Sequence, residues 1–373
     1  MALTFPAMSA NTTAIGLPVS ELETPALCLD LDAYRRNAAR MADFIIRTHH
    51  LDWRPHMKGQ KAPELARELI AAGAVGVTCA TVYEAEAMVG AGVANVLVAN
   101  QIAGARKLKR LAKLVRRATV LTATDSEEHA RQLNAAALSS NVVIPVLVEV
   151  DVGMGRSGVP AGNAAAELGL AIGELPGLQF RGVMAWEGHV LAFEGDEKQA
   201  QIEKAIGELT DAAARCRAAG LSVEIVSASG SGTYRLSAGL PGLTEVQAGG
   251  GVLSDLNYQR WGLDHEFALS VLTRVVSRPT PARLIVDGGF KTMSVQHGSP
   301  RPMGLPPLRS MLLTAEHGIL ELELPDRSWR VGDLISFIPG YTDSTVCLHD
   351  EMCVTSNGVL VAVWAIPGRT GRR

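Results

Sequence analysis

The 373 residues of this sequence are enough for one large domain with an appendage, or for two domains. Hydrophobic residues make up 47% of the chain, and the net charge of −3 gives no electrostatic reason to expect nucleic acid or an anionic membrane as a partner. The five scattered cysteines lack a metal-ligand spacing and indicate a reducing compartment. The chain shows neither a signal peptide nor an apolar run of roughly 18 residues, so we expect a soluble cytoplasmic protein.

The first elements are an arm over residues 1–20, a strand at 26–30 and a helical segment at 31–50. From residue 51 onward, short apolar runs alternate with longer Ala-rich amphipathic segments, and eight such units follow one another. We expect strands at 52–57, 75–80, 95–99, 119–124, 143–151, 180–186, 222–228 and 244–249. The clearest helices between them are expected at 62–73, 82–92, 105–118 and 197–220. This alternation predicts an α/β fold, a (β/α)₈ barrel, with an open doubly wound sheet as the alternative.

After residue 258 the segments become short, extended and separated by Gly, Pro and Asp turns, which is typical of an all-β domain. The expected organisation is therefore an N-terminal arm and strand at 1–30, the barrel at 31–258 and a C-terminal β domain at 259–373. The strand at 26–30 precedes the barrel, and we expect it to join the sheet of the β domain.

Chemically capable side chains follow several of the barrel strands, where barrel enzymes have their active sites. Lys58 ends the first strand, Arg156 follows the fifth, and Trp186 and His189 follow the sixth. Glu187, in the same segment as His189, is interpreted as a structural partner for an arginine. These positions predict a lysine and a guanidinium at one barrel mouth.

Loops of small residues follow the last two barrel strands, at 227–233 and 247–251. Both expose backbone N–H groups, and these two loops form the usual phosphate site of this fold. A lysine opposite a phosphate site suggests a phosphorylated aldehyde bound to the amine, for which pyridoxal 5′-phosphate is the obvious candidate. A phosphosugar aldolase is the competing interpretation.

Five segments, in this order, resemble the alanine-racemase-like (fold-type III) pyridoxal-phosphate enzymes, and among them the D-threonine aldolase and D-serine dehydratase group. They are Arg54-Pro55-His56-Met57-Lys58, Asp151-Val152-Gly153-Met154-Gly155-Arg156-Ser157-Gly158, the run that ends at Tyr234, Asp287-Gly288-Gly289-Phe290-Lys291 and Thr345-Val346-Cys347-Leu348-His349-Asp350. The resemblance implies that Lys58 carries the cofactor, that Arg156 binds its phenolic oxygen and that the chain forms a homodimer. The other cofactor-binding residues that it suggests are His56, Trp186, Ser229, Gly230, Gly232, Thr233, Gly249 and Gly250.

The chain departs from its relatives at a C-terminal motif, Pro-x-His-x-Cys/Asp-x-Thr-Val, that supplies two metal ligands in that group. Tyr341 stands at the position of the histidine, and Asp343 at that of the second ligand. Two alternatives follow. In one, Asp343 binds a weakly held Mg²⁺ or Mn²⁺ together with substrate oxygens and waters. In the other, the metal is lost, and Tyr341 and Asp343 act directly as acid and base.

The predicted reaction is retro-aldol cleavage, by a pyridoxal-phosphate-dependent lyase, of a small D-β-hydroxy-α-amino acid such as D-threonine or 3-hydroxy-D-aspartate. Lys58, His189, Tyr341 and Asp343 are the predicted catalytic residues, since cleavage needs a base for the β-hydroxyl proton. The alternatives are a D-serine or D-hydroxyamino acid dehydratase, an amino-acid racemase with Lys58 and Tyr341 as its two bases, and a non-catalytic cofactor carrier.

Overall fold

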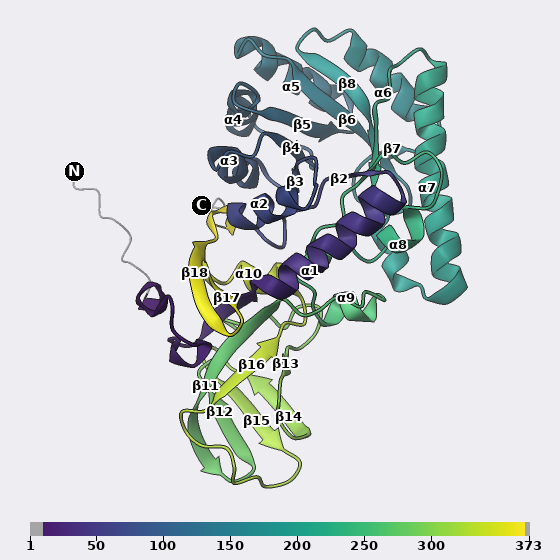
Figure 1. Cartoon of the computed structure of the whole chain (residues 1–373). Coiled ribbons are helices and arrows are strands. Elements are labelled where there is room, and N and C mark those ends of the chain that lie inside the picture. The colour runs from purple at the N-terminus through teal and green to yellow at the C-terminus, as the bar shows by residue number, and fades with distance from the viewer. Residues whose placement is uncertain (1–9, 370–373) are drawn as a thin grey trace, which may run out of the picture. The chain divides into compact units, whose positions relative to one another are not determined.

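The computed structural model of the protein describes residues 10–369, which form two compact units. One unit contains the described residues up to Asn37 together with Val252–Ile366, and we call it the β unit. The other contains Ala38–Gly251 and the described residues from Pro367 onward, and we call it the barrel unit. Figure 1 shows the elements of both units with the labels used below.

The barrel unit contains eight parallel strands in the order β2-β10-β9-β8-β6-β5-β4-β3. A parallel bridge between His56 and Thr78 joins the two ends of this order, so the strands close into a ring. The predicted barrel is therefore confirmed, and the open sheet was the wrong alternative. The strands are β2 (Asp52–Trp53), β3 (Val77–Cys79), β4 (Asn95–Val98), β5 (Thr119–Thr124), β6 (Ile144–Asp151), β8 (Leu178–Met184), β9 (Ile225–Ala228) and β10 (Glu245–Val246). A short extra strand that was not predicted, β7 (Val159–Pro160), pairs with β6 outside the ring.

Helices alternate with these strands, and each of the four helices named from the sequence is present. Figure 1 shows α3, α4 and α5 next to one another along the barrel. Side-chain caps begin two helices: Thr81 accepts a hydrogen bond from the Glu84 backbone, and Ser126 accepts one from the His129 backbone. The helices are α2 (Pro63–Ala71), α3 (Val82–Gly90), α4 (Ala105–Val115), α5 (Glu127–Ser139), α6 (Ala164–Gly173), α7 (Gly195–Ala218) and α8 (Tyr234–Ser237).

The barrel interior combines an apolar cluster with one buried ion pair. Leu97, Leu121 and Leu147, from successive strands, pack together with two further buried residues. The Arg54 Nε donates a hydrogen bond to Glu245 at 2.7 Å, and both side chains are almost completely buried. This pair links the first barrel strand to the last, so it contributes to ring closure as well as to packing.

The β unit is a mostly antiparallel sheet in the order β14-β15-β12-β11-β1-β17-β18, with β16 paired to β11 and β13. Its strand β1 (Ala26–Asp30) lies antiparallel to β11 and parallel to β17, so the expected pairing of the N-terminal strand with this sheet is confirmed. The other strands are β11 (Leu269–Thr280), β12 (Arg283–Val286), β13 (Arg301–Pro302), β14 (Leu308–Leu313), β15 (Gly318–Leu322), β16 (Leu334–Ile338), β17 (Glu351–Ser356) and β18 (Val359–Ala365). The unit also contains two short helices, α9 (Leu256–Arg260) and α10 (Thr342–Val346).

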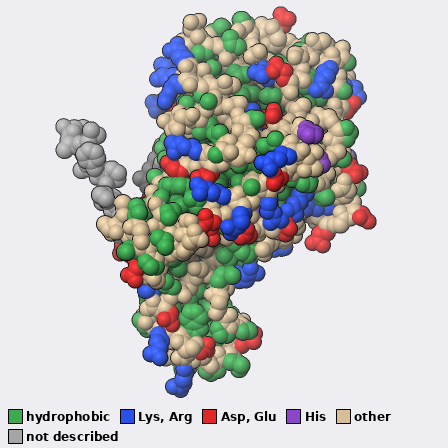
Figure 2. Space-filling model, viewed as in Figure 1, with side chains coloured by type: hydrophobic (Ala, Val, Ile, Leu, Met, Phe, Trp, Pro, Cys, Tyr) green, Lys and Arg blue, Asp and Glu red, His purple; other side chains and the backbone are tan. Residues whose placement is uncertain are grey.

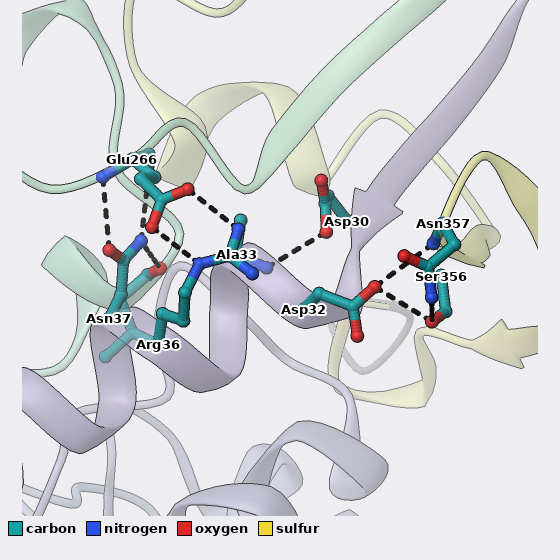
Figure 3. Close-up of polar contacts among 9 residues, drawn as sticks. Asp30, Asp32, Ala33, Arg36, Asn37, Glu266, Ser356 and Asn357 are labelled. Atoms are coloured by element: carbon teal, nitrogen blue, oxygen red, sulfur yellow. Dashed lines mark hydrogen bonds and ion pairs between the residues drawn. The ribbon is translucent and has the colours of Figure 1, made fainter.

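Polar contacts fix the start of helix α1 (Leu31–Ala42) within the β unit (Figure 3). Asp30 caps the helix by accepting a hydrogen bond from the Ala33 backbone at 2.9 Å. Asp32 accepts hydrogen bonds from Ser356 Oγ and from the Asn357 backbone, at 2.8 and 3.1 Å. These contacts tie the chain that leaves β1 to the turn after β17.

The predicted helix at 31–50 continues after α1 as a π-helix over Asp43–Thr48.

Figure 2 shows Lys and Arg side chains interspersed with Asp and Glu side chains over the face in view. Between residues 10 and 369, no helix combines the length and the apolar character that a membrane span requires.

Candidate active site

The extended segment after β2 places Lys58 at the end of the first barrel strand. The His56 backbone N–H donates to the Gln247 carbonyl at 3.0 Å, and the Met57 N–H donates to the Thr78 carbonyl at 2.7 Å. These bonds hold the segment between its two neighbours in the ring. The half-buried Lys58 then extends its amine to 5.9 Å from the centre of the Trp186 ring. The carboxyl ends of all barrel strands face one mouth, so a side chain after the sixth strand can lie beside one after the first, and here a cation lies beside an indole ring.

His56 supports the backbone of the lysine with a neutral ring. Burial lowers the pKa of His56 well below its usual range, and the cationic Lys58, Lys61 and Arg156 act in the same direction. The neutral ring has a free lone pair, and its Nδ1 lies 3.2 Å from the Lys58 backbone N–H, which donates to it. His56 therefore positions Lys58, while its predicted contact with the cofactor stays a prediction.

The buried carboxyl group of Glu187 binds the loop after β9 through hydrogen bonds. Glu187 accepts a hydrogen bond from Thr233 Oγ1 at 2.6 Å and a longer one from the Ser229 backbone at 3.3 Å. Burial raises the pKa of Glu187, and these two hydrogen bonds partly oppose that effect. Its partners are thus this loop and not the arginine expected from the sequence.

Glu187 was not among the predicted site residues, because its partners lie more than 40 residues further along the chain. Its position at the end of a predicted strand, between Trp186 and His189, could have indicated a site residue.

Glycines permit close approaches at both small-residue loops. A Cβ at Gly249 would lie 2.4 Å from the backbone nitrogen of His56, and a Cβ at Gly230 would lie 2.3 Å from the Trp186 ring. The two loops also contact each other, since the Gly251 N–H donates to Ser231 Oγ at 2.8 Å. The structure therefore brings the two predicted phosphate loops, Trp186 and the lysine segment together.

The loop after β6 carries Arg156. Asp151 shapes this turn by accepting hydrogen bonds from the backbones of Gly153 and Gly155, each at 3.0 Å. The Arg156 guanidinium is 56% exposed and lies 3.7 Å from the buried carboxylate of Glu149. Its remaining donors are therefore open to a ligand.

His189 packs against the Arg156 loop. A Cβ at Gly153 would meet its ring at 2.8 Å, and its buried Nδ1 has no hydrogen-bond partner among the described residues.

Tyr341 and Asp343 lie in the β unit, at the start of α10. The Tyr341 hydroxyl donates to Asp343 Oδ2 at 3.0 Å. Burial raises the pKa of Tyr341 above its usual range, and the neighbouring Asp343 adds to this shift. Burial also raises the pKa of Asp255 to about 6, against the hydrogen bonds that it accepts from Thr342 and Tyr258. The structure brings Tyr341 and Asp343 together, and their predicted action on the same substrate as Lys58 stays a prediction.

A closed barrel with a lysine at the end of its first strand, two glycine loops at its last strands and a β unit that contains the N-terminal strand define the fold-type III class. The chain belongs to the alanine-racemase-like family of pyridoxal-phosphate enzymes. The family model "Alanine racemase, N-terminal domain" matches residues 29–255, and "Putative serine dehydratase domain" matches residues 268–355. The resemblance inferred from the sequence is thereby confirmed.

Relatives cover nearly the whole chain. A D-threonine aldolase from Arthrobacter sp is 32% identical over 95% of this chain and 94% of its own length, and a 3-hydroxy-D-aspartate aldolase from Paracoccus denitrificans is 33% identical over the same shares. The structure of D-threonine aldolase from Filomicrobium marinum has a TM-score of 0.92 at 33% identity and covers 96% of this chain and 98% of that one.

A dehydratase is also similar to this chain. The structure of D-threo-3-hydroxyaspartate dehydratase from Delftia sp. HT23 has a TM-score of 0.82 at 27% identity, over 93% of this chain and 98% of that one. A cysteine-to-alanine mutant of a D-threo-3-hydroxyaspartate dehydratase is known in the metal-free form, with a TM-score of 0.81 at 27% identity over the same shares.

Proposed function

We propose that this protein is a pyridoxal-phosphate-dependent lyase that cleaves small D-β-hydroxy-α-amino acids, such as D-threonine or 3-hydroxy-D-aspartate, into an amino acid and an aldehyde. The observation that carries the proposal is the convergence of the Lys58 amine, the Trp186 ring and the two glycine loops at one end of the barrel. Both aldolase relatives support the choice of reaction, since each matches the chain over nearly its full length.

The barrel residues fit the cofactor. In this proposal Lys58 holds its aldehyde carbon covalently, and Arg156 binds its phenolic oxygen. Backbone N–H groups are well suited to phosphate, and a side chain at Gly249 would collide with the backbone of His56, so this part of the cradle requires glycine. Trp186 and His56 flank the lysine. The phosphate loops comprise Ser229, Gly230, Gly232, Thr233, Gly249 and Gly250.

The cofactor supplies an electron sink for charge that develops at the substrate α-carbon. The protein decides which bond breaks by aligning that bond with the ring system. In the proposed cleavage a base takes the proton of the β-hydroxyl, the Cα–Cβ electrons stay with Cα, and the aldehyde carbonyl forms. His189 is the barrel candidate for this base, because its Nδ1 has no hydrogen-bond partner in the described part of the chain. Tyr341 and Asp343 are the candidates from the β unit.

Dehydration is the second candidate function. The similarity to a D-threo-3-hydroxyaspartate dehydratase and the matched serine dehydratase domain favour it. In that reaction the α-proton leaves before the hydroxyl, with the amine of Lys58 as the base. Racemisation receives less support, since solved alanine racemases are only 14% identical and show the fold alone.

A substrate panel separates these functions. D-Threonine and 3-hydroxy-D-aspartate should each release glycine together with an aldehyde, whereas a dehydratase would release ammonia and a keto acid, and a racemase would release neither. The L-enantiomers serve as controls. Appearance of ammonia without aldehyde would contradict aldol cleavage.

The covalent assignment has its own test. Borohydride reduction of the cofactor-loaded protein, followed by peptide mapping, should place the label on Lys58. Lys58→Ala should lose the label and the activity, while Lys113→Ala, on the exposed side of α4, should keep both. A label on another lysine would refute the assignment.

A further inference from the structure

The Tyr341–Asp343 pair is where this chain differs from the metal motif of its relatives. In that motif a histidine and a cysteine or aspartate, two residues apart, hold a divalent ion. Here a phenol takes the place of the imidazole. We infer that Tyr341 and Asp343 form a hydrogen-bonded acid–base pair in place of a metal site, and that this protein works without a resident divalent ion there. The inference deepens the proposed function and rests on it for the role of the pair in catalysis.

One hydrogen bond joins the two side chains of the pair. The Tyr341 hydroxyl has one proton, and it donates this proton to Asp343 Oδ2 over 3.0 Å. A phenol that keeps its proton is not among the ligands that divalent ions prefer, which are carboxylates, imidazoles, thiolates, carbonyls and water. The same bond occupies one of the two carboxylate oxygens of Asp343. The pair is therefore arranged to hold a proton rather than an ion.

The neighbouring groups do not replace the missing imidazole. Asp255 uses its carboxylate to accept hydrogen bonds from the Thr342 backbone and hydroxyl, at 2.7 and 2.9 Å, and from the Tyr258 backbone at 2.8 Å. His297 packs edge-on against Tyr341, with 5.2 Å between the ring centres. Over residues 10–369, no group of three or more His, Cys, Asp and Glu side chains is placed to hold a metal ion.

Aromatic packing fixes the phenol in this position. The ring of Tyr341 lies 6.2 Å from that of Tyr258 and 6.3 Å from that of Trp261, measured between ring centres. A ring surrounded in this way has little freedom to turn its hydroxyl away from Asp343.

Such a pair can perform the proton transfer that the proposed cleavage needs. An ionised Asp343 accepts the proton of a β-hydroxyl while the Cα–Cβ electrons remain with Cα and the aldehyde carbonyl forms. The Tyr341 hydroxyl stabilises the ionised carboxylate by donating to it. This chemistry requires no Lewis acid. After the aldehyde departs, the carboxylate loses the proton to water and water supplies one to Cα, so that the amino acid product is complete.

The test places an imidazole at position 341 with the variant Tyr341→His and measures bound Mn²⁺. The cofactor-loaded full chain is treated with chelator, incubated with Mn²⁺ and desalted, and its metal content is determined by mass spectrometry. We expect no bound Mn²⁺ in the wild type or in Tyr341→Phe, which is the matched control for removal of the hydroxyl. Tyr341→His should bind Mn²⁺ roughly 10- to 100-fold more tightly than the wild type, or more. Removing a residue that only supports a metal ligand already weakens metal binding by this factor, so restoring a ligand should gain at least as much. Adding Asp343→Asn to Tyr341→His should abolish this gain.

Three results would overturn the inference. The first is a stoichiometric ion in the wild type that is lost in Asp343→Asn or in His297→Ala. The second is a Tyr341→His variant that gains no Mn²⁺. The third is wild-type turnover that disappears with chelator and returns with Mn²⁺. Because the first two measure metal and not turnover, they decide the inference even if the substrate panel rejects aldol cleavage.

Discussion

Removal of the Glu187 carboxyl should weaken the binding of the cofactor's phosphate without changing Lys58, the proposed site of attachment of its aldehyde. In Glu187→Ala, the backbone N–H of Ser229 loses its buried acceptor, and the hydroxyl of Thr233 keeps only the longer bond to the Gly230 carbonyl at 3.2 Å. An unsatisfied buried donor costs about 1–3 kcal/mol. If one such cost is added to the free energy of phosphate binding by this loop, the affinity for the phosphorylated cofactor decreases by roughly 5- to 150-fold.

The assay compares two ligands that differ only in the phosphate. Protein stripped of cofactor is titrated with pyridoxal 5′-phosphate and with pyridoxal, for the wild type, Glu187→Ala and Glu187→Gln. We expect Glu187→Ala to lose affinity for the phosphorylated ligand only, and Glu187→Gln to recover part of it, because the amide oxygen still accepts one hydrogen bond. Equal losses for both ligands would show that Glu187 acts through the general fold, and unchanged affinities would refute its role in the loop.

Four further outcomes are expected. Arg54→Met should lower the free energy of unfolding by about 3–5 kcal/mol, because Glu245 stays buried without its cation. The double variant Arg54→Met with Glu245→Leu should recover much of this loss, and urea titration measures both changes. Gly249→Ala should abolish cofactor binding, measured by absorbance, because the added Cβ would meet the backbone of His56. Asp255, whose pKa is about 6 in the folded protein against an ordinary value of 3.8, binds more protons in the folded state. Its contribution to the free energy of unfolding is therefore largest below pH 4 and decreases by about 3 kcal/mol as the pH rises through 6, and Asp255→Asn should remove this contribution from pH-resolved unfolding curves. Light scattering should report a homodimer, in keeping with the edge strand β14 and its 60% exposed Leu312; a monomer at micromolar concentration would contradict this.

The sequence predicted the barrel better than it predicted the lengths of the barrel strands. The run expected at 52–57 contains a two-residue strand only, because Pro55 has no N–H to donate, although the chain stays extended as far as the bridge at His56. The run expected at 244–249 likewise ends at Val246, where the glycine loop begins. Apolar runs therefore located the strands, while backbone hydrogen bonding determined where they end.

The candidate site divides in a similar way. Lys58 and the two loops were predictable, because strand ends and small residues are visible in the order of the chain. The arginine partner predicted for Glu187 was wrong. Its actual partners follow the seventh barrel strand and come close to it only because the sixth and seventh strands pair in the folded barrel. The hydrogen bond between Tyr341 and Asp343 also needed coordinates, although the substitution of the histidine was visible without them.

The central place of β1 in its sheet has a consequence for biosynthesis. This strand leaves the ribosome near the beginning, yet its two neighbours, β11 and β17, are made only after the whole barrel sequence has been translated. Until then both hydrogen-bonding edges of a very apolar segment are without their native partners. A nascent chain that stops near residue 350 contains β11 but lacks β17, so one edge of β1 stays unpaired in an otherwise nearly complete chain. We expect such a chain to be prone to aggregation.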